Sequence, residues 1–161
     1  MTVMVIIAIL CLMAIPVYST VKNRVAKVNC MANLKSLYVA TNTYVQQYNH
    51  WPQIDPKLIR TNPKLYADDW ITTLQPFGVG PSTWICPTVQ ASIGNPDYTK
   101  LQYERSDYIA TPFDDKSYTP HKWDTQPWFA ERGNVHGNGN LLIMSNGSMH
   151  ELNDLISSQK K

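Results

Sequence analysis

Charge is scarce in this sequence, and no basic excess is present that would suit a nucleic-acid partner. Only 16% of the 161 residues are charged, and the formal net charge is +2. Proteins that bind nucleic acid usually present a basic patch or stripe to the phosphates. We therefore expect no nucleic-acid partner, and the length suits one domain of ordinary size.

Motifs for catalysis and metal binding are also missing. The sequence has no Ser-His-Asp spacing, nucleophile elbow, phosphate loop or pair of catalytic carboxylates. The four histidines are scattered without the Cys/His spacing of a zinc site, so we expect them at the surface or in turns. We expect no enzymatic activity, no cofactor and no metal site. A calcium ion held by the oxygen atoms of Asp114 and Asp115 is the alternative to a solvated acidic loop.

The residues before the first charge, Lys22, form a long apolar run. Met1 to Tyr18 read MTVMVIIAILCLMAIPVY, with Thr2 the one strongly polar side chain. As a helix the run spans about 27 Å, close to the roughly 30 Å hydrocarbon core of a bilayer. We favour a membrane helix that stays in place; a cleaved signal peptide and a buried core helix are the alternatives. A signal peptide has a basic segment ahead of its apolar segment, and no Lys or Arg precedes this run.

An amphipathic pattern continues the apolar run. Apolar residues recur at spacings of three and four, as in a helix with one apolar face. They are Val25, Val28, Met31, Leu34, Tyr38, Thr41, Val45 and Tyr48. We expect one helix from Val3 to about Tyr48, about 70 Å long. The alternative is two helices broken at Pro16, because proline lacks the backbone donor of a helix interior.

The N-terminal residues resemble the type IV pilin and type II secretion pseudopilin superfamily. The run VIIAILCLMAIPVYS, from Val5 to Ser19, is similar to the family's apolar helix, which ends at a proline and continues into an amphipathic half. If Pro16 is the family's proline, the family's glutamate and peptidase site would fall ahead of Met1. The match in this segment is fairly specific.

Three short segments extend the resemblance to one pilin-like group. This group has a cysteine in the helix, as in Cys30-Met-Ala-Asn-Leu-Lys35, and a Cys-Pro in the head, as in Trp84-Ile-Cys-Pro87. It also has a histidine followed after nine residues by an Asp-Gly hairpin. His136 stands at that distance from Asn146-Gly147, with asparagine where aspartate is usual.

The resemblance implies a structural subunit of an extracellular pilus-like filament, which polymerises through its hydrophobic N-terminal helix. The expected filament core consists of Val5, Ile6, Ile7, Ile9, Leu10, Leu12, Met13, Ile15 and Pro16. Expected partners are copies of the chain in a helical homopolymer, inner-membrane lipid before assembly, and pilus or secretion machinery. The expected location is the bacterial inner membrane, then an extracellular filament or periplasmic pseudopilus. A type II secretion pseudopilin and a single-pass membrane-anchored surface binding protein are the alternatives.

The expected fold is α+β, a long N-terminal helix packed against a small antiparallel sheet in the ladle shape of pilins. Residues 1–21 are the apolar half of the helix and 22–50 the amphipathic half. Residues 51–161 are the globular head, which packs with 22–50 as one domain. The helix face expected to pack against the head consists of Val28, Met31, Leu34, Tyr38, Thr41 and Val45.

Prolines at short intervals divide the head into short elements. One or two helical turns are expected within Leu58–Leu74. The expected strands are Thr83–Cys86, Tyr108–Ala110, Asn140–Met144 and Ser148–Leu152, and the last two would pair as a hairpin in a sheet of three or four strands.

Two features of the head have further expected roles. Asn146 and Gly147 predict a tight type I′ turn in that hairpin, which needs positive φ at both central residues. Exposed aromatic side chains would supply interface anchors. The candidates for this role are Trp51, Trp70, Trp84, Trp123 and Trp128.

Three cysteines lie in different surroundings. Cys11 belongs to the apolar run, where a thiol behaves as a small apolar group. Cys30 lies on the amphipathic helix and Cys86 in the head, and we predict a disulfide between them. The extracytoplasmic location that the resemblance implies would permit this oxidation. Two reduced, buried thiols are the alternative.

Overall fold

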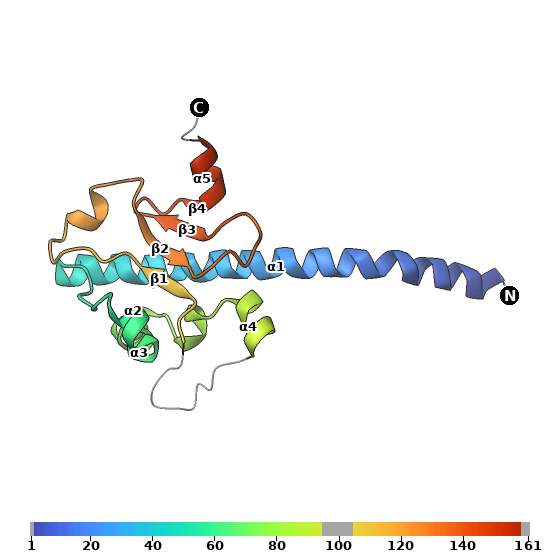
Figure 1. Ribbon diagram of the computed structural model, residues 1–161, viewed down its shortest axis with the longest axis horizontal. Helices are drawn as coiled ribbons and strands as arrows, with labels where there is room; N and C mark the ends of the chain where they lie inside the picture. The colour runs from blue at the N-terminus through green and yellow to red at the C-terminus, as the bar shows by residue number, and fades with distance from the viewer. Residues whose placement is uncertain (1, 95–104, 159–161) are drawn as a thin grey trace.

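One long N-terminal helix supports the head, which packs against its C-terminal part. The computed structural model describes residues 2–94 and 105–158, with side chains described from residue 21 onward. Helix α1 runs from Thr2 to Tyr48, 47 residues, and only its C-terminal part is packed against the head (Figure 1). The predicted continuous helix is confirmed. The alternative of two helices broken at Pro16 is wrong, because α1 passes through that residue.

Short helices form one part of the head. They are α2 (Leu58–Thr61), α3 (Pro63–Leu74), η1 (Gln75–Phe77), η2 (Pro81–Trp84), α4 (Pro87–Ile93), η3 (Thr119–His121) and α5 (Leu152–Ser158). Proline stands at or next to the first helical position of α3, η2 and α4, where its missing N–H costs nothing. The Asn62 side chain caps α3 by accepting a hydrogen bond from the Leu65 N–H. The proline-rich sequence therefore starts helices as well as ending them.

A four-stranded antiparallel sheet forms the other part. Its strands β1 (Tyr108–Ala110), β2 (Pro127–Glu131), β3 (Leu141–Met144) and β4 (Met149–Glu151) lie in chain order. The α+β class and three of the predicted strands are confirmed. The predicted strand at Thr83–Cys86 is wrong: Pro81 starts the 3-10 helix η2 there, and Pro87 starts α4 just after Cys86. Strand β2 was not predicted; it begins with a proline, which a first strand residue tolerates.

The hairpin between β3 and β4 has a different turn from the predicted one. The Gly147 N–H donates to the Met144 carbonyl over 2.9 Å, so the two central residues are Ser145 and Asn146. Of the residues in this turn, only Gly147 has a positive φ, at 77°. This is a three-residue loop in which a glycine bulge follows the turn, so the type I′ prediction is wrong.

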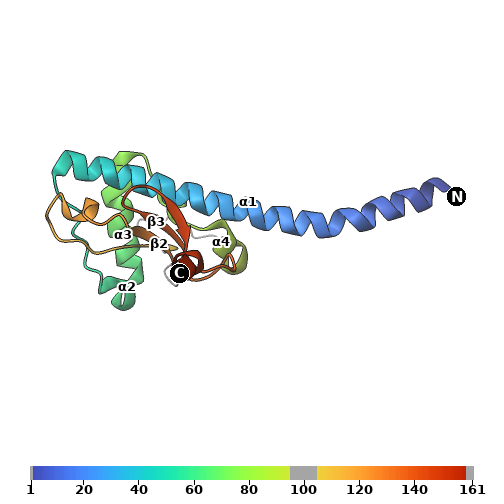
Figure 2. The same ribbon diagram turned by 90° about the horizontal axis from the view of Figure 1, so that it is seen from above.

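The core lies between the sheet, the short helices and one face of α1. The covered face of α1 consists of its buried residues, which are Cys30, Leu34, Leu37, Ala40, Thr41 and Val45. Met31 and Tyr38 lie half-buried beside it. Val28 was expected on this face, but it is 61% exposed, so that prediction is wrong. Figure 2 shows the sheet lying along one side of α1.

Aromatic side chains fill the core. The ring centres of Trp51 and Trp128 are 5.1 Å apart, and those of Trp70 and Phe129 are 5.7 Å apart. Edge-to-face pairs of this kind stabilise a core beyond their buried area. Four of the five tryptophans expected to be exposed are therefore buried: Trp51, Trp70, Trp84 and Trp128. Trp123 alone among the five is exposed, at 53%.

Candidate functional site

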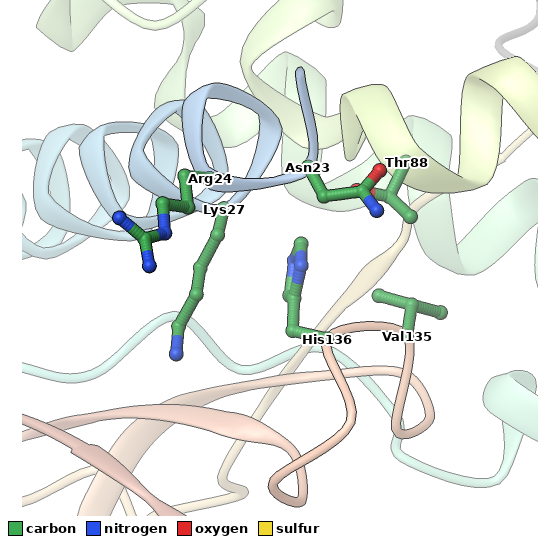
Figure 3. Close-up of a pocket in the computed structure, with 6 residues that line it drawn as sticks. All are labelled: Asn23, Arg24, Lys27, Thr88, Val135 and His136. Atoms are coloured by element: carbon green, nitrogen blue, oxygen red, sulfur yellow. The ribbon is translucent and has the colours of Figure 1, made fainter. Parts of the chain in front are cut away.

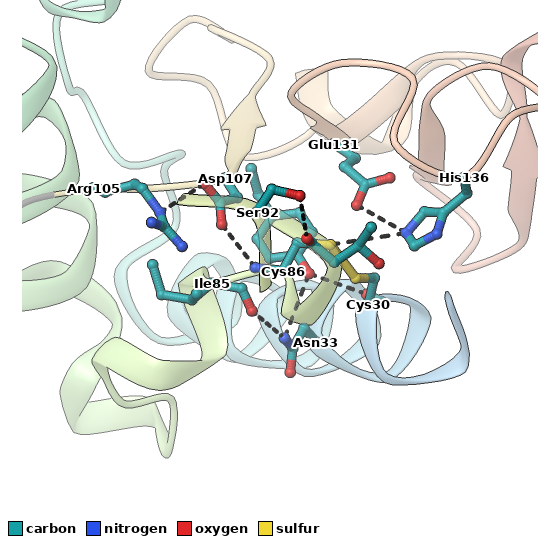
Figure 4. Close-up of a disulfide and its surroundings, with 11 residues drawn as sticks. Cys30, Asn33, Ile85, Cys86, Ser92, Arg105, Asp107, Glu131 and His136 are labelled. Atoms are coloured by element: carbon teal, nitrogen blue, oxygen red, sulfur yellow. Dashed lines mark hydrogen bonds and ion pairs between the residues drawn. A yellow bond between two sulfur atoms is a disulfide. The ribbon is translucent and has the colours of Figure 1, made fainter. Parts of the chain in front are cut away.

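A disulfide joins α1 to the head. Cys30 lies on the covered face of α1, and Cys86 lies between η2 and α4, with the two Cα atoms 5.3 Å apart (Figure 4). The predicted Cys30–Cys86 disulfide is confirmed. Both cysteines are fully buried, so the covalent link lies inside the core.

Two titratable side chains meet the disulfide. Glu131 ends β2, and His136 lies in the loop between β2 and β3. The His136 Nε2 atom is 3.2 Å from Glu131 Oε1 and 3.8 Å from Cys86 Sγ. The His136 side chain is 4% exposed, and the Glu131 side chain is fully buried. We call the four residues Cys30, Cys86, Glu131 and His136 the cysteine corner.

Burial favours the neutral forms of both titratable groups in the corner. It raises the pKa of Glu131 to about 7, and the negative charge of Asp107 adds to this. Burial also lowers the pKa of His136, and the positive charge of Lys27 acts in the same direction. Both shifts oppose a fully charged pair. Burial therefore weakens the ionic character of the contact between His136 and Glu131.

Polar contacts hold the Cys86 segment against its neighbours. The Cys86 N–H donates to Asp107 Oδ2 over 2.9 Å, and Arg105 Nε is 3.0 Å from Asp107 Oδ1. From α1, the Asn33 side chain donates to the Ile85 carbonyl over 3.0 Å. Because three elements converge here, the corner is fixed by tertiary contacts and has no local motif.

A pocket of about 410 Å³ opens beside the corner. Its lining residues are Asn23, Arg24, Lys27, Thr88, Val135 and His136. Figure 3 shows Arg24 and Lys27 extending from α1, with His136 and Val135 across from α1. Lys27 Nζ pairs with the Glu151 carboxylate of β4. Glu151 therefore offsets the charge of Lys27, and Arg24 adds positive charge to the pocket wall. The His136 ring borders both the pocket and the corner.

The face of α1 that points away from the head carries a second candidate site. The head-free stripe consists of Val21, Val25, Val28, Ala32, Ser36, Val39 and Thr43, which are all exposed. Its four valines are between 51% and 61% exposed. The spacing of three and four residues places the seven side chains on one helix face, and none of them is charged. An apolar, uncharged stripe of this length is typical of a helix-packing surface.

The structure describes the two residues predicted for calcium binding, but not the side chains of those predicted for the filament core. Val5, Ile6, Ile7, Ile9, Leu10, Leu12, Met13, Ile15 and Pro16 lie outside the residues whose side chains are described. Within the described part of the chain, no helix has the length and apolar character needed to cross a membrane. Asp114 and Asp115 join no cluster of three potential metal ligands in the described part of the chain. Asp114 instead accepts a hydrogen bond from the Lys116 N–H.

Glu131 and His136 were missed as site residues. His136 was expected at the surface or in a turn, and its side chain is almost fully buried instead. Ligand spacing could not identify the corner, because its four residues come from α1, the η2–α4 junction, β2 and a loop. The useful sequence signal was the pilin-like pattern, which singled out Cys30, Cys86 and His136 but did not place His136 beside the predicted disulfide.

Comparisons of the chain with protein-family models, curated proteins and solved structures find no match. Its function has therefore to be inferred from its own residues and their arrangement.

Proposed function

We propose that this chain is a structural, non-enzymatic subunit of an extracellular pilus-like filament and polymerises through α1. In this proposal the molecule has the ladle arrangement of a pilin, with the free part of α1 as the handle. The apolar run from Met1 to Tyr18 supplies the filament core. Before assembly the same run would lie in inner-membrane lipid, whose hydrocarbon core it nearly matches in length.

The head-free stripe is the observation that carries this proposal. It extends the apolar character of the run along α1 as far as Thr43, on the face that the head leaves open. A protein that works alone gains nothing from an uncharged face of this length in water. Helices of neighbouring copies could cover the stripe, and the buried apolar area would stabilise the contact at roughly 25 cal/mol per Å².

The polar groups of the stripe also permit burial. Ser36 Oγ donates to the Ala32 carbonyl over 3.0 Å, and Thr43 Oγ1 donates to the Val39 carbonyl over 2.9 Å. Both hydroxyls are therefore hydrogen-bonded within their own helix. Covering the stripe would leave neither donor unsatisfied, which removes the usual cost of burying a hydroxyl.

The polymer would be open-ended. The stripe lies on one side of α1 and the head on the other, so each copy offers two different surfaces to its neighbours. Contacts between unlike surfaces generate a helical filament when the rotation does not close. The disulfide agrees with an extracytoplasmic location, since structural disulfides persist in oxidising compartments. A periplasmic pseudopilus of a type II secretion system would use the same contacts.

A membrane-anchored surface binding protein is the second candidate. The pocket beside His136 favours it, because Arg24 gives one wall positive charge that would attract an anionic ligand. In that case the stripe would have no role in polymerisation, and the chain would not form fibres.

A pair of substitutions on α1 tests the filament proposal. Val28→Asp places a charge in the stripe, whereas Asn23→Asp adds the same charge at an exposed position about 140° away around the helix, on the side opposite the stripe. We expect Val28→Asp to abolish fibres in sheared surface material viewed by negative-stain microscopy, because burying an unpaired carboxylate costs several kcal/mol. Ile9→Asp, in the apolar run, should act in the same way.

The control defines the contrary result. Asn23→Asp should form fibres like the unchanged chain, and all three variants should retain the near-ultraviolet circular dichroism of a folded head. Normal fibres from Val28→Asp, or no fibres from the unchanged chain, would refute the filament proposal.

A further inference from the structure

The cysteine corner presents four side chains of the kinds that bind zinc. One ligand atom each from Cys30, Cys86, Glu131 and His136 lies within 4.8 Å of the other three. We propose that the chain in its dithiol form binds one Zn²⁺ through these four residues. The site is separate from the head-free stripe, and the inference does not depend on the filament proposal.

The ligand set and its size suit zinc. Structural zinc sites have four ligands in a tetrahedron, drawn mainly from cysteine and histidine, with carboxylates also used. Bond lengths of about 2.0–2.3 Å require ligand atoms to lie roughly 3.3–3.8 Å apart. Two pairs already lie close to that range: Cys86 Sγ to His136 Nε2 at 3.8 Å and His136 Nε2 to Glu131 Oε1 at 3.2 Å. Separating the two sulfur atoms is the main movement needed.

The Glu131 carboxyl is an independent indication of a ligand. Its side chain is fully buried, and its Oε2 atom has no hydrogen-bond partner in the part of the chain that the structure describes. A buried oxygen atom without a partner is costly. A cation between Glu131 and His136 would satisfy that oxygen, since carboxylate oxygen atoms are zinc ligands.

The charge of the proposed zinc site also suits its surroundings. Two thiolates and one carboxylate around Zn²⁺ give a net charge of about −1. Arg24 lines the adjoining pocket and would offset this charge. The same pocket reaches His136 from the surface, so it provides a path for the ion (Figure 3).

Disulfide and metal would exclude each other. A dithiol reductant transfers two electrons and two protons to the disulfide, which yields the Cys30 and Cys86 thiols and the reductant's own disulfide. Zinc then displaces both thiol protons into solvent. An oxidising protein disulfide reverses this: it accepts the two electrons, the Cys30–Cys86 bond forms, and the ion leaves. The metal would thus hold α1 to the head before the covalent bond does.

Zinc uptake by the full chain in detergent micelles tests the proposal. The disulfide is reduced with a phosphine, which takes one oxygen atom from water and leaves two thiols. After addition of Zn²⁺ and desalting, elemental analysis should find about one ion per reduced chain and none per oxidised chain. Co²⁺ in place of Zn²⁺ should give thiolate charge-transfer bands and the visible bands of a tetrahedral site.

Matched variants identify the ligands. His136→Ala should weaken zinc binding at least 100-fold and Glu131→Gln roughly tenfold, because losing a ligand costs no less than losing a supporting contact. His121→Ala removes an exposed histidine elsewhere in the head and should leave affinity unchanged. Near-ultraviolet circular dichroism checks folding, and His136→Gln replaces His136→Ala if the alanine variant unfolds.

Two results would overturn the proposal. One is a folded, reduced chain that binds no zinc or gives an octahedral Co²⁺ spectrum. The other is His136→Ala or, if that variant unfolds, His136→Gln with the affinity of the unchanged chain. If reduction alone unfolds the head, refolding on addition of Zn²⁺ supports the proposal, and a head that stays unfolded with Zn²⁺ refutes it.

Discussion

The two faces of α1 are both rich in apolar residues, yet the molecule treats them differently. The covered face, from Cys30 to Val45, is buried by the head of the same chain. The head-free stripe, from Val21 to Thr43, is left exposed on the other side of the same helix. Apolar residues alone therefore do not identify the core of a single chain, because the covered face packs in the core whereas the head-free stripe stays exposed.

The covered face is also held by specific bonds that the stripe lacks. Cys30 is bonded to Cys86, and Tyr38 donates to the Ser145 carbonyl over 2.9 Å. On the stripe, the hydroxyls of Ser36 and Thr43 bond only to α1 itself. Changes on the covered face should therefore lower stability, whereas changes on the stripe should spare it.

The largest effect on stability should come from the disulfide. The double variant Cys30→Ser/Cys86→Ser opens a link between residues 56 positions apart, and we expect it to lose about 4 kcal/mol of unfolding free energy. Chemical denaturation in detergent, followed by near-ultraviolet circular dichroism, measures the change. Cys11→Ser leaves the disulfide intact and is the control. A loss below about 1 kcal/mol in the double variant would mean that the link contributes little to the covered face.

Truncation in the middle of the covered face should have the next largest effect. Leu37 is fully buried, and Leu37→Ala should cost about 3 kcal/mol through lost burial and the cavity left behind. Gln47→Ala, at an exposed position of the same helix, should change stability by less than about 0.5 kcal/mol. Equal midpoints for these two variants in the same denaturation experiment would contradict the contrast between the faces.

The β3–β4 turn tests how tightly the head closes over the covered face. A Cβ atom on Gly147 would lie 2.9 Å from Lys35 Nζ and 3.1 Å from the Tyr38 ring, and the φ of 77° already disfavours a side chain. We expect Gly147→Ala to cost about 1–2 kcal/mol. Gly80→Ala is the control, because Gly80 has a negative φ and open space around its Cβ position. If Gly147→Ala left the free energy of unfolding unchanged, the turn would be able to move away from α1.

Sequence patterns predicted the parts of the fold that depend on local structure. The length of α1 and three of the four strands follow from periodicity and turn residues, and the disulfide was assigned correctly. Periodicity could not choose between the two apolar faces, which is why Val28 was assigned to the wrong face and Leu37 was missed. The choice depends on where the head packs, which is a tertiary property.

The cysteine corner and the aromatic core were beyond local patterns for the same reason. Glu131 and His136 meet Cys86 only because β2 and its following loop pass beside α1. A tryptophan suits both an interface and a core, so composition could not show that Trp51 and Trp128 pack against each other. The predicted role of the apolar run as a filament core stays a prediction, since those side chains are not described.

A substitution in the stripe should have the smallest effect on stability. This small effect distinguishes the stripe from the covered face. Val39 is 52% exposed, so we expect Val39→Ala to change the unfolding free energy by less than about 0.5 kcal/mol. If neighbouring copies cover Val39, the lost contact should raise the critical concentration for assembly roughly tenfold, because each buried methylene group contributes about 0.8 kcal/mol.

Sedimentation of fibres at graded protein concentrations measures that threshold. Asn23→Ala, exposed on the side of α1 opposite the stripe, should leave this threshold unchanged. An unchanged threshold in Val39→Ala would show that this part of the stripe lies outside the contact. A drop in stability of more than about 1 kcal/mol would place Val39 in the fold of the single chain and remove the difference between the two faces at that position.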